Sequence, residues 1–275
     1  MSELAPAKIN LCLFLGATRA DGRHELVSVM QSLAWGDAVA AEPAERDEVV
    51  CPGIDGPNLA AAALAAIPAR RSPLRLTIDK RIPVAAGLGG GSADAAAALR
   101  LAGREAGLAE DELLALAAKL GADVPAQVRP GRSLATGAGE VVEHLDAAPR
   151  FGVLVVPSAH TLSTADVYRE ADRLGLPRDP ADLAARLDDV RVGLGQGPFG
   201  LRADLIINDL EPAALFLCPS IARDLELARE LGADRVMVSG SGPTVLGLFA
   251  DPAGAQRAAG RIVGRTPQAI ATTPL

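Results

Sequence analysis

The sequence has no apolar run that approaches the roughly 20 residues needed to cross a bilayer, although 49% of its 275 residues are hydrophobic. Its opening, Met1 to Lys8, lacks the basic start and the apolar centre of a secretory signal. A cytoplasmic location without membrane contact is therefore expected. At this chain length, two lobes that share a cleft are a more natural organisation than a single core.

Cysteine and histidine are scarce, and neither forms a metal-binding pattern. Cys12, Cys51 and Cys218 are odd in number, far apart and without CxxC spacing, which argues against a disulfide framework and against a zinc site. His144 and His160 have no partner at ligand spacing, and no Ser/His/Asp arrangement can be read. The cysteines are expected to be ordinary buried thiols, and the protein ligands of any metal stay unassigned.

Positive charge is limited as well. The net charge is -7, and the lysines are only Lys8, Lys80 and Lys119. Nucleic acid is therefore not an expected partner, because phosphate backbones are bound by clustered lysines and arginines. A compact ammonium does different chemistry from a planar guanidinium, so each lysine is a candidate for a specific role.

Periodicity and turn residues predict an α+β chain. In residues 1–150, strands are expected at 7–17, 27–33, 38–42 and 74–79, and helices at 59–67, 93–106 and 110–120. In residues 151–275, strands are expected at 151–156, 235–238 and 245–249, and helices at 164–174 and 220–231. The boundary between two lobes is placed at residue 150.

A glycine-rich loop leads into the predicted helix at 93–106. In the segment Gly87-Leu-Gly-Gly-Gly-Ser92, glycines allow backbone N–H groups to converge on an anion at the positive end of a helix. The loop has neither the Lys-Ser/Thr ending of a Walker motif nor the spacing of a dinucleotide fold. On glycine content alone, a phosphate site and a flexible turn are equally supported.

Other polar residues have ordinary structural readings when each is taken alone. Lys8 lies on an apolar strand, where a lysine is usually a solvated charge. Asp123 follows a helix, where an aspartate commonly caps or turns the chain. His24 follows a turn at Asp21-Gly22, and residues 239–243 (Ser-Gly-Ser-Gly-Pro) are typical of a hairpin turn. Their meaning depends on whether they occur together.

Together, these segments resemble the three signatures of the GHMP kinases, in order and along nearly the whole chain. Residues 5–11, 83–97 and 238–244 are similar to the first, second and third signature. Within that superfamily, six shorter strings resemble the family of 4-diphosphocytidyl-2-C-methyl-D-erythritol kinases: residues 20–26, 58–59, 80–83, 121–125, 163–168 and 208–211.

The resemblance implies a fold and a reaction. The fold would be the two-lobed α+β GHMP kinase fold, with a ribosomal S5 domain 2-like N-terminal lobe and a ferredoxin-like C-terminal lobe. The reaction would be ATP-dependent phosphorylation of the 2-hydroxyl of the cytidyl substrate, with Mg2+, in non-mevalonate isoprenoid precursor synthesis. The enzyme would act on this small molecule as a monomer or homodimer.

The resemblance also implies residue roles. Asp123 matches the base that takes the hydroxyl proton, and Lys8 matches the catalytic lysine that orients this carboxylate and offsets negative charge. The implied ATP-binding residues are Asn58, Lys80, Pro83, Val84, Ala85, Ala86, Gly87, Leu88, Gly89, Gly90, Gly91, Ser92 and Ala93. The implied substrate-binding residues are Asn10, Arg23, His24, Thr164 and Tyr168.

Three positions depart from the family pattern. Arg23 stands where the family usually has tyrosine, so we expect Arg23 and Tyr168 to close on opposite faces of the cytosine, with His24 reading its polar edge. The alternative is that Arg23 points to solvent and Tyr168 stacks alone. The other departures, residues 126–127 and Arg132, concern loop packing more than chemistry.

Two other functions stay open. A sister GHMP kinase for homoserine or a mevalonate intermediate would share the glycine loop, but it should lack the strings at residues 21–24 and 208–211. A non-catalytic GHMP-fold protein that serves as a binding module would not require intact Lys8 and Asp123.

Overall fold

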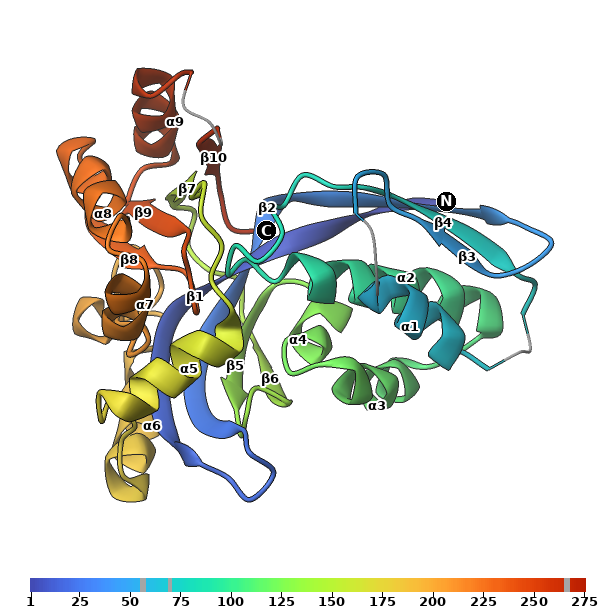
Figure 1. The fold of residues 1–275 in the computed structure, drawn as a ribbon, viewed down its shortest axis with the longest axis horizontal. Helices are drawn as coiled ribbons and strands as arrows, with labels where there is room; N and C mark the ends of the chain where they lie inside the picture. Colours follow the sequence, from blue (N-terminus) through green and yellow to red (C-terminus); the bar gives the residue numbers. More distant parts are fainter. Residues whose placement is uncertain (55–57, 69–70, 265–267) are drawn as a thin grey trace.

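The computed structural model describes residues 1–54, 58–68, 71–264 and 268–275, and it contains two sheets at an angle to each other (Figure 1). The larger sheet has the strand order β3-β4-β2-β5-β6, with β1 paired to β2, and the smaller sheet has the order β10-β7-β9-β8. The predicted α+β class is confirmed. In the described part of the chain, no helix is both long and apolar enough to cross a membrane.

Two long antiparallel strands, β1 (Ser2–Thr18) and β2 (His24–Pro43), form the frame of the molecule. The free edge of β2 pairs with β4 (Leu74–Asp79) near one end and with β5 (Arg132–Thr136) near the other. The short strands β3 (Glu48–Val50) and β6 (Val141–Leu145) extend the sheet on the two sides.

Sequence patterning divided β2 into two strands around Gly36, and the structure corrects this division. β2 continues through Gly36 because the backbone of β1 lies against it: a Cβ atom there would come within 2.2 Å of the Ala5 carbonyl oxygen. The glycine therefore permits close approach of two strands and does not interrupt one.

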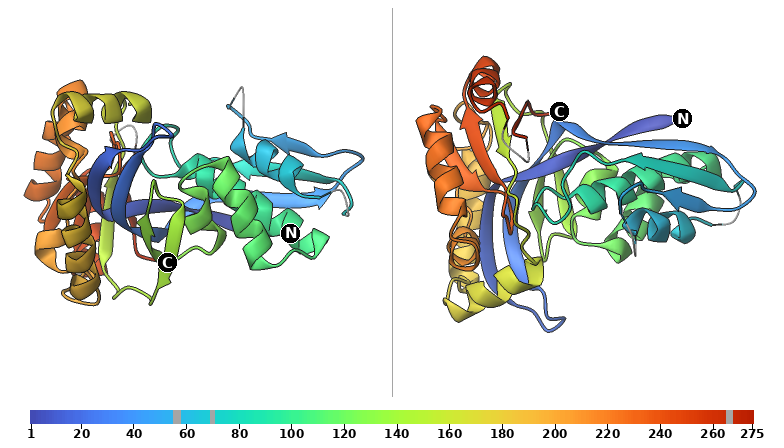
Figure 2. Two further views of the ribbon diagram at one scale, coloured as in Figure 1. Left: turned by 90° about the horizontal axis from the view of Figure 1, so that it is seen from below. Right: turned by 45° about the horizontal axis from the view of Figure 1, so that its top comes forward.

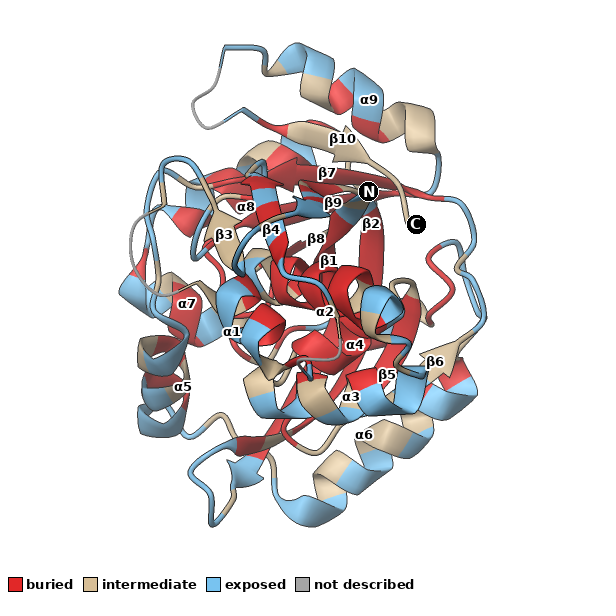
Figure 3. Ribbon diagram, turned by 90° about the vertical axis from the view of Figure 1, so that its right-hand side faces the viewer, coloured by how far each residue is buried: buried red, intermediate tan, exposed pale blue. Residues whose placement is uncertain are grey.

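Four helices cover one face of the larger sheet: α1 (Leu59–Ala66), α2 (Gly90–Ala106), α3 (Glu110–Leu120) and α4 (Val124–Val128) (Figure 1). Small residues let α2 pack closely, and residues 95–98 are alanines without any solvent exposure. Figure 3 shows that β1, β2 and α2 are largely buried, whereas α3 and α6 keep exposed faces. α2 begins at Gly90, three residues earlier than predicted, because Gly89 turns the chain in a left-handed conformation.

The smaller sheet consists of β7 (Gly152–Val156), β8 (Arg235–Val238), β9 (Val245–Phe249) and β10 (Ile270–Thr272). β7 is buried on both faces, as its continuous apolar sequence predicts. Val153 and Val155 face the core that includes β1, whereas Leu154 and Val156 belong to the core that includes α8 (Ile221–Glu230) and α9 (Pro252–Arg261).

The remaining helices gather with this sheet at one end of the molecule, away from α1–α4 (Figure 2). They are α5 (Thr164–Arg173), α6 (Pro180–Gly193) and α7 (Glu211–Leu217). α6 was not predicted, although Asp179 caps its first turn and Pro180 occupies the position where proline favours helix initiation. The lobe boundary at residue 150 stays a prediction; the final residues return to the larger sheet, where Leu33 forms a bridge with Pro274.

Candidate active site

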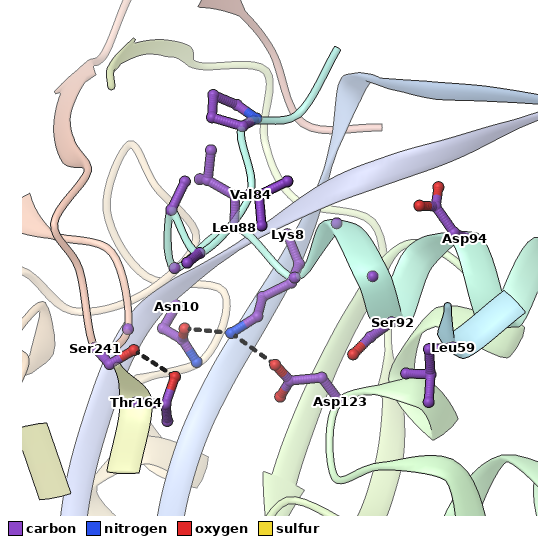
Figure 4. Close-up of a pocket in the computed structure, with 18 of the residues that line it drawn as sticks. Lys8, Asn10, Leu59, Val84, Leu88, Ser92, Asp94, Asp123, Thr164 and Ser241 are labelled. Atoms are coloured by element: carbon purple, nitrogen blue, oxygen red, sulfur yellow. Dashed lines mark hydrogen bonds and ion pairs between the residues drawn. The ribbon is translucent and has the colours of Figure 1, made fainter. Parts of the chain in front are cut away.

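A cleft of about 450 Å³ lies where β1, the glycine loop, the start of α2 and the tip between β8 and β9 meet (Figure 4). It is lined by nearly all of the predicted site residues: Lys8, Asn10, Asn58, Lys80, the whole of residues 83–92, Asp123, Thr164 and Tyr168. Ala93, Arg23 and His24 are not among the lining residues. Ala93 is fully buried in the core below α2, so its side chain does not reach the cleft.

Lys8 and Asp123 face each other inside this cleft. The Lys8 Nζ lies 3.3 Å from the Asp123 Oδ2 and donates a hydrogen bond to the Asn10 Oδ1 at 2.8 Å (Figure 4). Lys8 is only 7% exposed, so it is not a solvated surface charge. Asp123 precedes α4, but its side chain caps no backbone N–H of that helix. Its carboxylate is therefore available to Lys8 and to a ligand.

The glycine loop has left-handed backbone angles at three of its positions. Gly87 and Gly89 have φ angles of 74° and 68°, which side chains rarely adopt, and Ala85 is held at 55°. A Cβ atom on Gly89 would lie 2.8 Å from the Lys8 Cγ, so the lysine stem packs directly over the loop. α2 begins directly after Gly89. The N–H groups of its first turn have no partner within the helix, and this end of the helix faces the cleft.

The turn between β8 and β9 is fixed against the glycine loop. The Ser239 Oγ donates to the Gly87 carbonyl oxygen at 2.9 Å, and a Cβ atom on Gly87 would lie 2.3 Å from the Ser239 carbonyl oxygen. The Asn208 Nδ2 donates to the carbonyl oxygens of Val238 and Gly240 at 2.9 and 2.7 Å. The predicted order of strand, turn and strand is confirmed. Asn208, in the string at residues 208–211, holds this turn through its two hydrogen bonds.

Two buried aspartates that sequence reasoning missed hold Lys80. Its Nζ donates to Asp37 and, at 2.8 Å, to the Asp94 Oδ2. Burial raises the pKa of Asp94 to about 7, although Lys80 partly opposes this shift. Burial would lower the pKa of Lys80, but the hydrogen bonds that Lys80 donates to both carboxylates raise it above its usual value. The available signal was Asp94 itself, a single acidic residue within the alanine-rich run of α2.

Asp37 also accepts hydrogen bonds from the backbone N–H groups of Arg81 and Ile82, at 2.5 and 2.8 Å. The network therefore fixes the chain that enters the glycine loop. Because two carboxylates surround Lys80, its positive charge attracts an anionic ligand less strongly than the charge of a lysine without such partners would.

Of the residues predicted to contact the cytosine, Tyr168 lines the cleft, whereas Arg23 and His24 lie outside its lining. The His24 and Tyr168 rings are 5.1 Å apart at an angle of 50°, and the His24 Nε2 lies 2.7 Å from the Asp172 Oδ1. Burial, followed by the charge of Asp123, raises the pKa of Tyr168. Arg23 lies at the tip of the β1–β2 hairpin; its guanidinium donates two hydrogen bonds to the Asp21 carboxylate and lies 3.8 Å from the Glu140 carboxylate.

Comparison with known proteins places this cleft in context. The model for the GHMP kinases N terminal domain matches residues 58–131, and the model for the GHMP kinases C terminal domain matches residues 194–266. A Nocardioides protein named 4-diphosphocytidyl-2-C-methyl-D-erythritol kinase is 42% identical over 261 residues, which cover 89% of this chain and 86% of the relative.

Solved structures agree with these matches. A crystal structure of 4-(cytidine 5'-diphospho)-2C-methyl-D-erythritol kinase aligns with a TM-score of 0.78 and 34% identity, over 99% of this chain and 98% of its own. A homoserine kinase from Cytophaga hutchinsonii aligns with a TM-score of 0.69 over 100% of this chain and 94% of its own, but at 16% identity it shows similarity of fold alone.

Proposed function

Because the chain belongs to the family of 4-diphosphocytidyl-2-C-methyl-D-erythritol kinases, within the GHMP kinases, we propose that its cleft transfers the γ-phosphoryl group of ATP to the 2-hydroxyl of the cytidyl substrate. The chain is an ATP-dependent kinase of isoprenoid precursor synthesis. The observation that carries the residue assignment is the ion pair of Lys8 and Asp123 beside the glycine loop.

In this proposal, Asp123 accepts the proton of the attacking 2-hydroxyl as the new P–O bond forms and the bond from the γ-phosphorus to the bridging oxygen breaks, so that ADP leaves. Lys8 orients the carboxylate and stabilises negative charge that develops between donor and acceptor. Its Nζ is directed by the Asn10 Oδ1 and by Asp123, while its stem rests on Gly89. The lysine thus joins the substrate side of the cleft to the ATP side.

The glycine loop and the start of α2 are suited to bind a nucleoside triphosphate. The left-handed glycines open the backbone of the loop, and the start of α2 supplies N–H groups and a positive dipole end. In the described residues, no group of three or more His, Cys, Asp or Glu side chains could hold a metal ion. When bound, Mg2+ would neutralise phosphate charge, and the Ser92 hydroxyl, which lines the cleft, would be a protein ligand for it.

We further propose that the kinase works in the cytoplasm on a small molecule, without nucleic acid. It would work as a monomer or as a homodimer.

A coupled assay of ADP release tests the proposed function. The purified protein would be given ATP and Mg2+ with the cytidyl substrate, homoserine or mevalonate. Turnover with the cytidyl substrate alone is expected. Preference for homoserine or mevalonate would assign a sister kinase, and no turnover with any acceptor, despite ATP binding, would support the non-catalytic alternative.

Replacing Gly90 by valine should weaken ATP binding about tenfold or more, which corresponds to at least about 1.4 kcal/mol. Gly90 has a helical backbone, so the left-handed angles expected for the loop occur at Gly87 and Gly89 instead. Crowding is the reason for the effect: a Cβ atom would lie 2.9 Å from the Ile82 Cγ2 and 3.2 Å from the Lys80 Nζ. Calorimetric titration with ATP measures the change.

Gly260→Val on α9 is the matched control, because a Cβ atom there would meet nothing within 4 Å. It should cost only helix propensity and leave ATP affinity unchanged. Unchanged ATP affinity in a folded Gly90→Val protein would show that the loop does not bind the phosphates.

Arg23→Ala should raise KM for the cytidyl substrate about 5- to 100-fold without changing KM for ATP. Base stacking contributes about 1 to 3 kcal/mol, whereas an exposed ion pair such as Arg23–Asp21 contributes about 0.2 to 1 kcal/mol. The guanidinium can therefore leave Asp21 when a cytosine is available, and Tyr168 would bind the opposite face. Steady-state kinetics with each substrate varied in turn gives both constants.

Arg23→Tyr should restore much of the loss, because an aromatic ring can take the same stacking position. Asp21→Asn, which removes the nearer of the two carboxylate charges that pair with Arg23, should not raise KM. If Arg23→Ala leaves KM for the cytidyl substrate unchanged, the cytosine stacks on Tyr168 alone and Arg23 remains a surface charge.

A further inference from the structure

β1 departs from regular pairing directly after the two site residues that it carries. Asn10 pairs with Met30, but Cys12 pairs with Val29, so one extra residue is inserted into β1 at Leu11. Such a β-bulge leaves ladder groups unpaired and redirects the neighbouring side chains. The bulge lies in the buried centre of the molecule, where unpaired polar groups are costly.

Two side chains satisfy the groups that the bulge releases. The Ser28 Oγ donates to the Cys12 carbonyl oxygen at 2.6 Å, and the Val29 N–H donates to the Cys12 Sγ at 3.3 Å. Ser28 and Cys12 have no solvent exposure. Burial raises the pKa of the Cys12 thiol to about 12, so it remains neutral.

Ser28 holds the nitrogen of the Asn10 amide, whose oxygen faces Lys8 because an ammonium has only donors to offer. Since its only proton is donated to the Cys12 carbonyl oxygen, the Ser28 oxygen has lone pairs alone to offer Asn10, and it accepts from the Asn10 Nδ2 at 2.7 Å. The Asn10 Oδ1 then faces the Lys8 Nζ at 2.8 Å, and Lys8 reaches Asp123 at 3.3 Å. A continuous series of four contacts therefore links the backbone at the bulge with the Asp123 carboxylate: Lys8 donates to Asn10, Asn10 to Ser28 and Ser28 to the Cys12 carbonyl oxygen, and Lys8 also pairs with Asp123.

We propose that Ser28 is a positioning residue for phosphoryl transfer, which acts by holding the Asn10 amide so that Lys8 stays directed at Asp123. This inference rests on the proposed function. Ser28 does not line the cleft, so it acts on the reaction through Asn10 and Lys8 and not by contact with either substrate. If the Ser28 hydroxyl is removed, the Asn10 amide and the Cys12 carbonyl lose their hydrogen-bond partner. Lys8 is then no longer held in one direction.

Ser28→Ala should lower kcat for the cytidyl substrate about 10- to 100-fold, since small misplacements of catalytic groups have effects of this order. KM for ATP should not change. Ser28→Cys keeps a side chain of similar size but replaces the hydroxyl by a thiol, which is a weak hydrogen-bonding group, so kcat should fall here too. This second variant keeps the test valid if Ser28→Ala does not fold. Ser28→Thr, which keeps the hydroxyl, should retain most of the turnover.

Ser133→Ala is the matched control. Ser133 is also a buried serine of this sheet, on β5, and it lies outside the cleft lining. Removal of the Ser133 hydroxyl should leave kcat and both KM values at their wild-type level. Among the described residues, the contacts of Lys8 and Asn10 do not include Ser133.

A double-mutant comparison separates positioning from a general structural effect. Lys8→Ala and Lys8→Ala/Ser28→Ala should have equal residual turnover, because Ser28 acts only through Lys8. A further loss in the double variant, or wild-type kcat in folded Ser28→Ala and Ser28→Cys proteins, would overturn the inference. If the wild-type protein does not phosphorylate the cytidyl substrate, the proposed function fails instead, and this is measured before any variant.

Discussion

Asp123→Asn is expected to lower kcat about 10²- to 10⁴-fold, the range typical of a lost general base, while ATP binds as before. The amide keeps the size of the side chain, but it cannot accept the hydroxyl proton and cannot form the ion pair with Lys8. Because Asp123 caps no helix N–H, the substitution removes no contact that α4 requires. The fold and the nucleotide side of the cleft should therefore survive.

Single-turnover kinetics with the cytidyl substrate, together with calorimetric titration of ATP, would measure the chemical step and nucleotide binding separately. Asp166→Asn on α5 is a suitable control, since Asp166 is an exposed carboxylate whose partner is Arg169 on the same helix. It should behave as wild type. Wild-type turnover in the Asp123→Asn protein would remove Asp123 from the mechanism.

The parts of the site that could be predicted are those whose chemistry is local in sequence. The glycine loop and the helix that follows it are adjacent along the chain, so a tight turn that leads into a helix follows from residue types. The predicted end of α2 at Gly107 also agrees with the structure, because a left-handed glycine closes the helix there. Local sequence could not show that Lys8 and Asp123 meet, and only the resemblance to a family brought them together.

Long-range packing decided what could not be predicted. Asp37 and Asp94 come from β2 and α2, and their common partner Lys80 follows β4, so no spacing in the sequence marks them as a network. The short strand β10 pairs with β7, which lies more than 100 residues earlier in the chain, as in the pair Ile270 and Val155, and its three residues carry no alternation to detect. The bulge in β1 likewise depends on the register with β2 and not on a local motif.

At the tip of the β1–β2 hairpin, the local sequence predicted the turn correctly, but it did not determine the role of Arg23. Asp21 and Gly22 form the predicted turn, and Gly22 has a φ of 81°. The same turn holds Arg23 against Asp21, so the side chain expected to stack on the base is paired elsewhere in the structure without substrate. The energies of stacking and of an exposed ion pair decide between the two positions, and the Arg23 variants measure that balance.

Lys8→Arg is expected to be about as damaging as Lys8→Met, with a loss of about 100-fold or more in kcat, the scale of a misplaced or missing electrostatic group. The stem of Lys8 lies against Gly89, and its Nζ occupies a narrow position between Asn10 and Asp123. A guanidinium is planar and larger than an ammonium, so it cannot take this position without displacing the loop or the Asn10 amide.

The pair of variants separates charge from geometry. Lys8→Met keeps the stem and removes the charge, whereas Lys8→Arg keeps the charge and changes its shape. If charge near Asp123 were sufficient, the arginine variant would retain turnover and only the methionine variant would fail. Equal losses in kcat, with ATP affinity retained by calorimetry in the methionine variant, are the expected result. They would mean that the Lys8 side chain acts through a fixed position, which the glycine loop below it and the Asn10 amide beside it together define.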